Sequence, residues 1–282
     1  MERTLGLMCG AGALPARAAR AARRQGYRVV AFTFVGEPPD LAQAADRVVP
    51  SRIVEAAAVL EILLAERASA ALFSGAFGKR ELLAPEGAEA DASARDIVTR
   101  GDGRLGDRGL AQGVVTTLTA LGIEVLDQRS FLGAWLAGAG LLGARGPSDD
   151  ERAELARGLD VARALASTGA GQTVVCKRGI VAALEGMDGT SETIRRGLAL
   201  AGPGAVVVKA VAHDNDYRFD LPSVGVETMQ LLAAGGATAL AVEAGRVVVL
   251  DRERALPIAD AAGIAVVGTA LDDGAGALRA RA

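Results

Sequence analysis

The strongest constraint on the fold is an alternation of short apolar segments with amphipathic ones along the first half of the chain. The apolar segments predict strands at 5–8, 27–34, 46–49, 70–74 and 123–126. Helices are predicted at 14–25, 53–67 and 110–121, the first with Pro15 in its opening turn, where a missing N–H costs little. We therefore expect an α/β chain whose residues 1–140 form a doubly wound, Rossmann-like parallel sheet.

The second half of the chain has a different pattern of predicted elements, in which hairpins are mixed with helices. Residues 138–150 are rich in Gly and end in acids, so we expect a linker at 141–150 before a helix at 151–166. Hairpins are predicted at 173–184, around Lys177-Arg178-Gly179, and at 239–251, turning at Ala244-Gly245. A helix that carries Arg195 and Arg196 is expected after a cap at Thr190 or Ser191, and further helices are expected near 226–233 and 254–262, with strands at 205–211 and 265–267. This mixture predicts an α+β mixed-sheet domain over 151–270, followed by a flexible tail at 271–282.

Composition narrows the classes of function. The net charge of −3 argues against nucleic acid as the main partner. Cys9 and Cys176 are far apart and have no metal-ligand spacing, which suits a reducing compartment such as the cytoplasm. We expect no signal peptide, and the longest apolar run, 130–144, is shorter than the roughly 20 residues needed to span a bilayer.

Two candidate sites lie in the predicted parallel sheet. The first is the turn Gly10-Ala11-Gly12-Ala13-Leu14-Pro15, whose glycines would let backbone N–H groups approach a phosphate at a helix N-terminus. Pro15 stands where a dinucleotide-binding fingerprint has its third glycine, and the second strand ends without the acidic residue that would hold a ribose. Binding of NAD is therefore disfavoured. The second site is Gly75 to Lys79, after the fourth strand, where Lys79 could meet a phosphate. The alternatives are a tight turn without a ligand and an ordinary surface lysine.

Two further candidate sites lie in the second half. Glu185 and Asp188 precede a helix that carries Arg195 and Arg196, and either acid could instead be a simple helix cap. The richest stretch is His213 to Gly225, at the expected start of a helix, with Lys209 on the strand before it. Its carboxylates and its cation suit a site for phosphate and magnesium, while the alternatives are a solvated loop and a helix cap at Asp220.

The order of these motifs resembles the UDP-2,3-diacylglucosamine pyrophosphatases of lipid A biosynthesis, of the LpxI type rather than the calcineurin-like metallophosphatase type. The resemblance covers nearly the whole chain and is most specific in the second half. The matching stretches are Gly10 to Pro15, Gly75-Ala76-Phe77, Gly106-Asp107-Arg108, Gly171-Gln172-Thr173-Val174-Val175, Glu185 to Ser191 with Arg195-Arg196, Lys209 to Pro222, Ala241 to Gly245, Asp251-Arg252-Glu253 and Ala259-Asp260.

Several residues depart from the family pattern. Asp188 stands where the family has Glu, and Ser191, Ala212, His213, Asn215 and Arg108 replace Asp, Lys, Pro, Gln and Asp respectively. These changes leave open a divergent member that binds a sugar nucleotide or a lipid with altered or no hydrolase activity. An enzyme that uses a sugar nucleotide in another reaction also stays open.

The resemblance implies a magnesium-dependent hydrolase that cleaves the diphosphate of UDP-2,3-diacylglucosamine to 2,3-diacylglucosamine 1-phosphate and UMP. It implies a cytoplasmic homodimer, with peripheral contact to the inner membrane left open. We expect the catalytic carboxylates to be Asp220, Asp216, Asp188 and Glu185, with Asp220 and Asp188 as metal ligands. The expected substrate-binding residues are Gly10, Ala11, Gly12, Ala13, Leu14, Gly75, Lys79, Asp107, Gln172, Thr190, Arg195, Lys209 and Arg218.

Overall fold

The computed structural model describes residues 3–77, 90–101 and 107–270, and the chain divides into two compact units. The first unit holds the residues up to Leu132 together with Asp216–Asp220, and the second holds Gly133–Asn215 and the residues from Leu221 onward. The first boundary between the units therefore lies at Leu132/Gly133 rather than in the expected linker at 141–150. The five residues Asp216–Asp220, although they come from the second half of the sequence, belong to the first unit.

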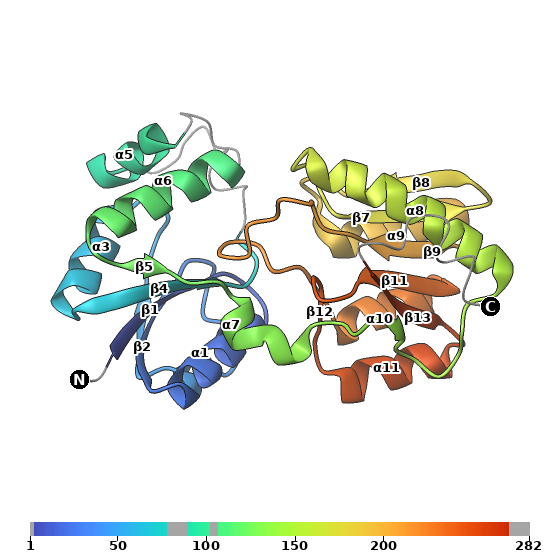
Figure 1. Cartoon of the computed structure of the whole chain (residues 1–282), viewed down its shortest axis with the longest axis horizontal. Helices are drawn as coiled ribbons and strands as arrows, with labels where there is room; N and C mark the ends of the chain where they lie inside the picture. Colours follow the sequence, from blue (N-terminus) through green and yellow to red (C-terminus); the bar gives the residue numbers. More distant parts are fainter. Residues whose placement is uncertain (1–2, 78–89, 102–106, 271–282) are drawn as a thin grey trace. The chain divides into compact units, whose positions relative to one another are not determined.

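The first unit is built on a parallel sheet of five strands in the order β3-β2-β1-β4-β5. Helix α1 covers one face, and α3, α5 and α6 lie on the opposite side (Figure 1). This is the predicted doubly wound arrangement. Its elements are β1 (Arg3–Cys9), α1 (Leu14–Arg24), β2 (Tyr27–Thr33), α2 (Leu41–Ala44), β3 (Arg47–Pro50), α3 (Ala56–Ala65), β4 (Ala68–Ser74), α5 (Ala92–Arg100), α6 (Asp107–Ala120), β5 (Glu124–Val125) and α7 (Arg129–Leu132).

One face of this sheet carries an apolar core that also receives a residue from the distant C-terminal half. The core joins strand residues such as Phe32 to Leu63 of α3 and Leu118 of α6. Phe219 packs against this cluster, with its ring centroid 4.8 Å from that of Phe73. Burial of apolar area by Phe219 explains why residues 216–220 belong to the first unit.

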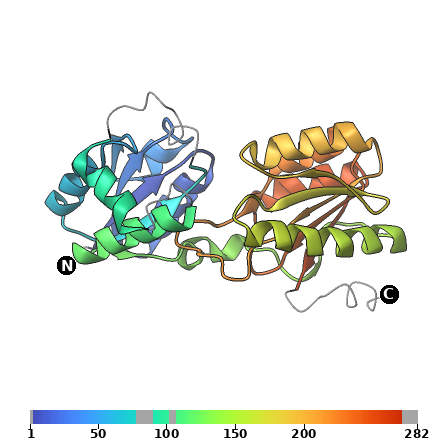
Figure 2. The ribbon, with the colours of Figure 1, turned by 90° about the horizontal axis from the view of Figure 1, so that it is seen from above.

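The second unit contains a mixed sheet of six strands in the order β6-β13-β11-β9-β7-β8. Strands β9, β11 and β13 are parallel, whereas β6, β7 and β8 make antiparallel pairs. Helix α8 lies on one face and α9 on the other (Figure 2). The elements are η1 (Gly133–Trp135), β6 (Gly140–Leu141), α8 (Asp149–Ser167), β7 (Thr173–Lys177), β8 (Ile180–Leu184), α9 (Gly189–Ala201), β9 (Val206–Lys209), β10 (Ser223–Val224), α10 (Val226–Ala234), β11 (Ala239–Glu243), β12 (Val248–Val249), α11 (Arg252–Ala261) and β13 (Ala265–Thr269).

One predicted hairpin is confirmed and the other is wrong. Strands β7 and β8 pair antiparallel, and Arg178 and Gly179 at the turn both have positive φ, of 50° and 78°, as a two-residue hairpin turn requires. In contrast, β11 pairs in parallel with β9 and β13, and β12 pairs in parallel with β10. The chain does turn at Ala244-Gly245, but the two strands beside that turn belong to different sheets.

The start of one helix differs from the expectation, and the start of another is confirmed and excludes an alternative for Asp220. Helix α8 begins after Ser148, whose hydroxyl accepts from the Glu151 amide at 3.2 Å while the Glu151 carboxylate accepts from the Ser148 amide at 2.7 Å. This reciprocal pair is a capping box. Helix α10 begins after Gly225, with β10 before it, so Asp220 is not a helix cap.

Candidate functional site

The carboxyl edge of the second sheet gathers polar side chains from five neighbouring strands. Thr173, at the start of β7, is in register with Lys209 at the end of β9, and the Glu185 amide bonds the Thr173 carbonyl at 2.9 Å. Across β11, Glu243 is in register with Thr269 at the end of β13. Ligands of open α/β sheets bind outside the carboxyl ends of the strands, so this edge is the candidate site of the second unit.

At this edge, Glu185 and Lys209 form a buried ion pair bridged by a hydroxyl. The Lys209 Nζ lies 3.9 Å from the Glu185 carboxylate and donates to Thr190 Oγ1 at 2.7 Å and to Thr173 Oγ1 at 3.3 Å. Thr190 Oγ1 in turn donates to Glu185 Oε1 at 2.9 Å, and the Gln172 amide donates to Oε2 at 3.1 Å. The structure thus brings together four of the residues that the sequence predicted: Gln172, Glu185, Thr190 and Lys209.

The environment keeps Glu185 ionised. Burial alone raises the pKa of its carboxyl, but the Lys209 charge and the hydrogen bonds from Thr173, Thr190 and the Gln172 amide outweigh it, so the net pKa lies below the ordinary value. A carboxylate stabilised in this way is a weak base. The geometry therefore suits a fixed negative charge that holds Lys209 and Thr190 in place.

Asp188 lies just before α9 and is also paired. Its carboxylate accepts from Arg196 Nη2 at 2.9 Å and from the Gly186 amide at 3.0 Å. The hydrogen bond from Arg196 lowers the pKa of Asp188. Arg195 is exposed and pairs with Glu192 one turn earlier.

Asp216 and Arg218 form a tight pair in the segment that joins the first unit. The Arg218 Nε and Nη2 atoms donate to the two carboxylate oxygens of Asp216 at 2.9 and 2.7 Å. This hydrogen bonding lowers the pKa of Asp216. Asp220 is exposed at the end of the same turn, and its amide bonds the Asp216 carbonyl at 3.1 Å.

A second acid–arginine pair lies beside this turn, and the sequence analysis missed it. Arg129 Nη2 donates to Asp127 Oδ2 at 2.6 Å, and the Arg129 guanidinium lies 3.9 Å from the centre of the Tyr217 ring. The Gln128 amide also bonds the Tyr217 carbonyl at 3.1 Å. The available signal was that Asp127 follows the last predicted strand of a parallel sheet.

The glycine turn after β1 is less open to a phosphate than predicted. The amides of Gly10 and Ala11 donate to the carbonyls of Ser74 and Ala76 at 2.9 and 2.8 Å, and the Ala76 amide returns a bond to Ala11. We call these three backbone hydrogen bonds, which join the loop after β1 to the loop after β4, the zipper. Strands β1 and β4 are neighbours at the centre of the sheet, and the chain builds the sheet outward from them in opposite directions. It leaves Gly12, Ala13 and Leu14 at the start of α1, a helix with no side-chain cap and no acid in its first turn.

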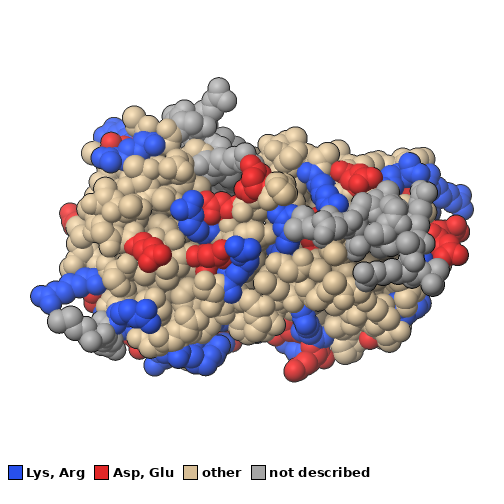
Figure 3. All heavy atoms as spheres, in the orientation of Figure 1, with Lys and Arg blue, Asp and Glu red and all other residues tan. Residues whose placement is uncertain are grey.

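Two of the predicted substrate-binding residues, Lys79 and Asp107, lie wholly or partly outside the described residues. Lys79 lies outside the described residues, and Asp107 begins α6 but its side chain lies outside them. On the face in Figure 3, acidic and basic side chains are intermingled, as the many acid–arginine pairs lead one to expect.

The described side chains do not by themselves fit a magnesium site. Within residues 3–77, 90–101 and 107–270 no three His, Cys, Asp or Glu side chains converge as metal ligands. Both carboxylate oxygens of Asp188, one of the two predicted ligands, already accept hydrogen bonds. In addition, no helix of the described chain has the length and apolarity needed to cross a membrane.

Comparison with known proteins accounts for both units. The family model of the LpxI N-terminal domain matches residues 4–135, and that of the LpxI C-terminal domain matches residues 138–267. The chain is also 30% identical over 279 residues to the UDP-2,3-diacylglucosamine pyrophosphatase LpxI of Caulobacter vibrioides, an alignment that covers 94% of this chain and 97% of that protein. From the two domain matches and the near full-length alignment, we conclude that the chain belongs to the LpxI family.

Proposed function

We propose that this protein hydrolyses the diphosphate of UDP-2,3-diacylglucosamine and yields 2,3-diacylglucosamine 1-phosphate and UMP. The observation that carries the proposal is the alignment along nearly the whole length of a relative named for this activity. In the reaction, a water oxygen bonds to one phosphorus and the bridging P–O bond breaks. The proton of the attacking water passes to solvent through a carboxylate that acts as a base.

We assign the orientation of the attacking water to Asp220. Asp220 lies within the stretch from Lys209 to Pro222, in the half of the chain where the resemblance to the family is most specific. Asp220 is exposed and directly follows Phe219, whose ring is packed in the core of the first unit.

Arg218 is the candidate for stabilising charge on the phosphates. Its pairing with Asp216 uses Nε and Nη2, so the Nη1 edge lies outside the pair. A guanidinium that is already oriented stabilises the negative charge that develops on the phosphates better than a mobile one does, because it need not reorganise during the reaction. Asp216 therefore serves as the group that orients Arg218.

The test is release of UMP from purified UDP-2,3-diacylglucosamine, with and without added magnesium because the family resemblance implies a requirement for it. We expect D220N to lower kcat by at least about 100-fold, the usual scale for a lost acid–base group. The matched control is D149N, which removes the charge of an aspartate whose side chain is 92% exposed on α8. Full turnover by D220N would contradict the assignment. Binding of the substrate without any release of UMP by the wild type would favour the non-enzymatic alternative.

A further inference from the structure

The first unit contains the same local motif twice, an aspartate that binds the arginine two residues after it. In the pairs Asp127–Arg129 and Asp216–Arg218, the carboxylate accepts from the arginine amide at 2.8 and 3.1 Å, from Nε at 3.1 and 2.9 Å and from Nη2 at 2.6 and 2.7 Å, respectively. An aspartate that accepts from the amide two residues on forms an Asx-turn. We call residues 127–129 the first turn and residues 216–218 the second turn, and both belong to the first unit.

The two turns contact each other through Tyr217, the middle residue of the second turn. Its carbonyl accepts from the Gln128 amide at 3.1 Å, and the centre of its ring lies 3.9 Å from Cζ of Arg129. The charges of the two turns also interact. Hydrogen bonding to Asp216 raises the pKa of Arg218 against the effect of burial, and the negative charge of Asp127 adds to this rise. The first turn therefore holds the backbone and the ring of Tyr217.

The first turn is fixed between two regular elements of the first unit. Just before it, the Leu126 amide bonds the Ala71 carbonyl in β4 at 2.8 Å. Just after Asp127, helix α7 begins at Arg129, and the Ser130 amide bonds the Asp127 carbonyl at 3.1 Å. The second turn instead lies in the irregular segment 210–222 between β9 and β10. Its place in the first unit thus depends on its contacts, and those with the first turn are the ones nearest to Arg218.

Stability alone is a poor reason for this arrangement. The four charged side chains of the two turns are between 34% and 42% exposed. Ion pairs with such exposure contribute little to stability, because water screens the charges and long side chains lose freedom. The pairs do fix geometry, since the amide, Nε and Nη2 of Arg218 all bind one carboxylate. Its guanidinium therefore has one orientation relative to the second turn, and the position of that turn decides where the guanidinium lies.

We propose that Asp127 and Arg129 are positioning residues for Arg218, acting through Tyr217 to hold the guanidinium that stabilises charge on the diphosphate. In this arrangement Asp127 keeps Arg129 over the Tyr217 ring, and Arg129 keeps the second turn in place. The kinetic part of the inference rests on the proposed function, in which Arg218 meets the phosphates. The structural part, that the first turn holds the second, concerns one unit only and can be tested without any turnover.

The test compares the variants R129M, R129K and D127N with the control R100M. Arg100 is a matched control because it also pairs with an aspartate of the first unit, Asp96, at 2.7 Å. Its side chain is 44% exposed, against 42% for Arg129.

Four measurements separate structure from catalysis. Hydrogen exchange at the Gln128 amide reports on the contact between the two turns. The NMR signal of the Arg218 Nε–H group reports on the mobility of its guanidinium. Thermal unfolding reports on stability, and UMP release gives kcat and KM separately.

We expect R129M to speed exchange at Gln128 by about threefold or more, the scale of a lost cation–π contact. The Arg218 Nε–H signal should broaden, and kcat should fall by at least about tenfold, because a mobile group stabilises a developing charge less well than a fixed one. R129K keeps a cation near the ring but cannot bind Asp127 through two nitrogen atoms, so its losses should be intermediate. R100M should leave the exchange, the signal and kcat unchanged. D127N serves if R129M does not fold.

A double-mutant cycle with R218M tests whether Arg129 acts through Arg218. R129M should lower kcat by less than about twofold once Arg218 is absent, because the group that it positions is already gone. An effect on the fold in general would instead lower kcat by the same factor in both backgrounds.

Unchanged exchange at Gln128 and an unchanged Arg218 signal in both R129M and D127N would overturn the structural part. Faster exchange with full kcat, or equal losses from R129M with and without Arg218, would overturn the positioning of Arg218. A wild-type protein without hydrolase activity would refute the proposed function, while the exchange and NMR data would still decide whether the first turn holds the second.

Discussion

The Nζ of Lys209 lies 3.9 Å from the carboxylate of Glu185, and the exposed fractions of these two side chains are only 6% and 12%. Each charge is therefore taken out of water with the other as its main compensation. Removing one partner leaves an uncompensated buried charge, which typically costs about 3–5 kcal/mol, whereas removing both costs much less.

This relationship predicts a coupling between the two residues. K209M should lower the free energy of unfolding by about 3 kcal/mol, and the double variant K209M/E185Q should recover part of that loss. Urea unfolding of the two single variants and the double variant measures the coupling. If the double variant loses the sum of the single losses, the pair does not stabilise the fold.

A second prediction concerns the acid dependence of stability through Glu151. Burial raises the pKa of this carboxyl, but hydrogen bonds from Arg145, the Ser148 amide and Thr238 outweigh it and lower the pKa to about 2. Because the folded-state pKa lies below the unfolded one, the stabilisation is complete above about pH 4.3 and is lost as the pH falls toward 2.

Unfolding measured between pH 6 and pH 2 should therefore show a shallower loss of stability in E151Q than in the wild type. The control is E253Q, which removes the charge of an exposed glutamate on α11. Parallel pH profiles for wild type and E151Q would show that Glu151 does not carry this dependence.

The local parts of the fold were predictable from sequence, and the distant pairings were not. Strands and helices of the first unit follow from the spacing of apolar residues, which is a local property. The turn at Ala244-Gly245 has the chemistry of a hairpin, with Gly245 at φ 71°. Yet β11 and β12 each pair with strands from elsewhere in the chain, β9 and β13 for the one and β10 for the other, and no local signal contains that information.

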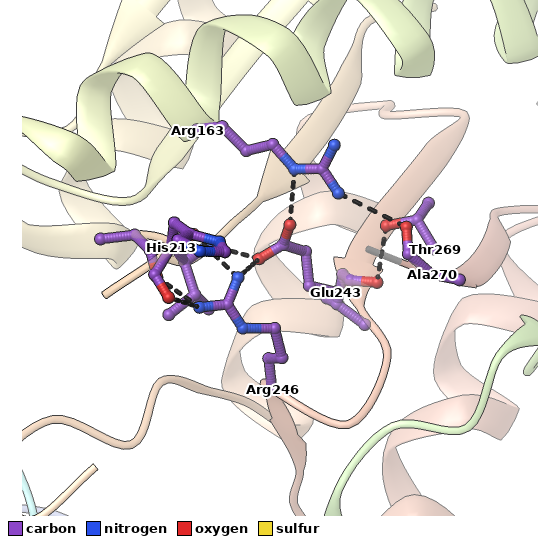
Figure 4. A network of polar contacts seen from close by, with 9 residues as sticks. Arg163, His213, Glu243, Arg246, Thr269 and Ala270 are labelled. Atoms are coloured by element: carbon purple, nitrogen blue, oxygen red, sulfur yellow. Dashed lines mark hydrogen bonds and ion pairs between the residues drawn. The ribbon is translucent and has the colours of Figure 1, made fainter. Parts of the chain in front are cut away.

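The candidate site likewise contains residues that could be predicted from sequence and contacts that could not. Glu185, Thr190 and Lys209 could be selected because they lie in two stretches, Glu185 to Ser191 and Lys209 to Pro222, that match the family pattern. The contacts of Glu243 with Arg163 (Figure 4) and with the Val211 amide could not be predicted, because they depend on the order of β9, β11 and β13 in the sheet. Likewise, the contact of Arg129 with Tyr217 joins residues that sequence analysis assigned to different domains.

A third prediction uses two glycines with the same backbone conformation and different surroundings. Gly12 and Gly75 both have φ of 93°, but a Cβ at Gly12 would meet nothing within 4 Å, whereas one at Gly75 would lie 2.7 Å from the Ala11 carbonyl oxygen. Both alanine variants carry the cost of a strained positive φ, about 1–3 kcal/mol. Only Gly75→Ala also disrupts the zipper between the loops after β1 and β4.

We therefore expect Gly75→Ala to destabilise the protein by at least about 1 kcal/mol more than Gly12→Ala, because a backbone atom cannot move aside as a flexible side chain can. Chemical unfolding of the two variants gives this difference directly. Equal losses would mean that the zipper adapts to a side chain at Gly75.

The last prediction concerns how Asp220 is held from the side of the first unit. Phe219 packs against the apolar core there, with its ring 4.8 Å from that of Phe73, and Asp220 is the next residue. Truncating Phe219 should release this anchor while leaving the charges of Asp216, Arg218 and Asp220 unchanged. We expect F219A to lower kcat by at least about tenfold, since a displacement of about 1 Å at a reacting group can cost 100-fold.

F219L is the matched variant, because leucine keeps most of the buried apolar area and should keep most of the activity. The comparison of kcat for F219A and F219L with that of D220N separates a misplaced carboxylate from a missing one. F219A should retain a residual rate above that of D220N, because its carboxylate still visits the productive position. An F219A protein as active as the wild type would show that packing of Phe219 on Phe73 does not position Asp220.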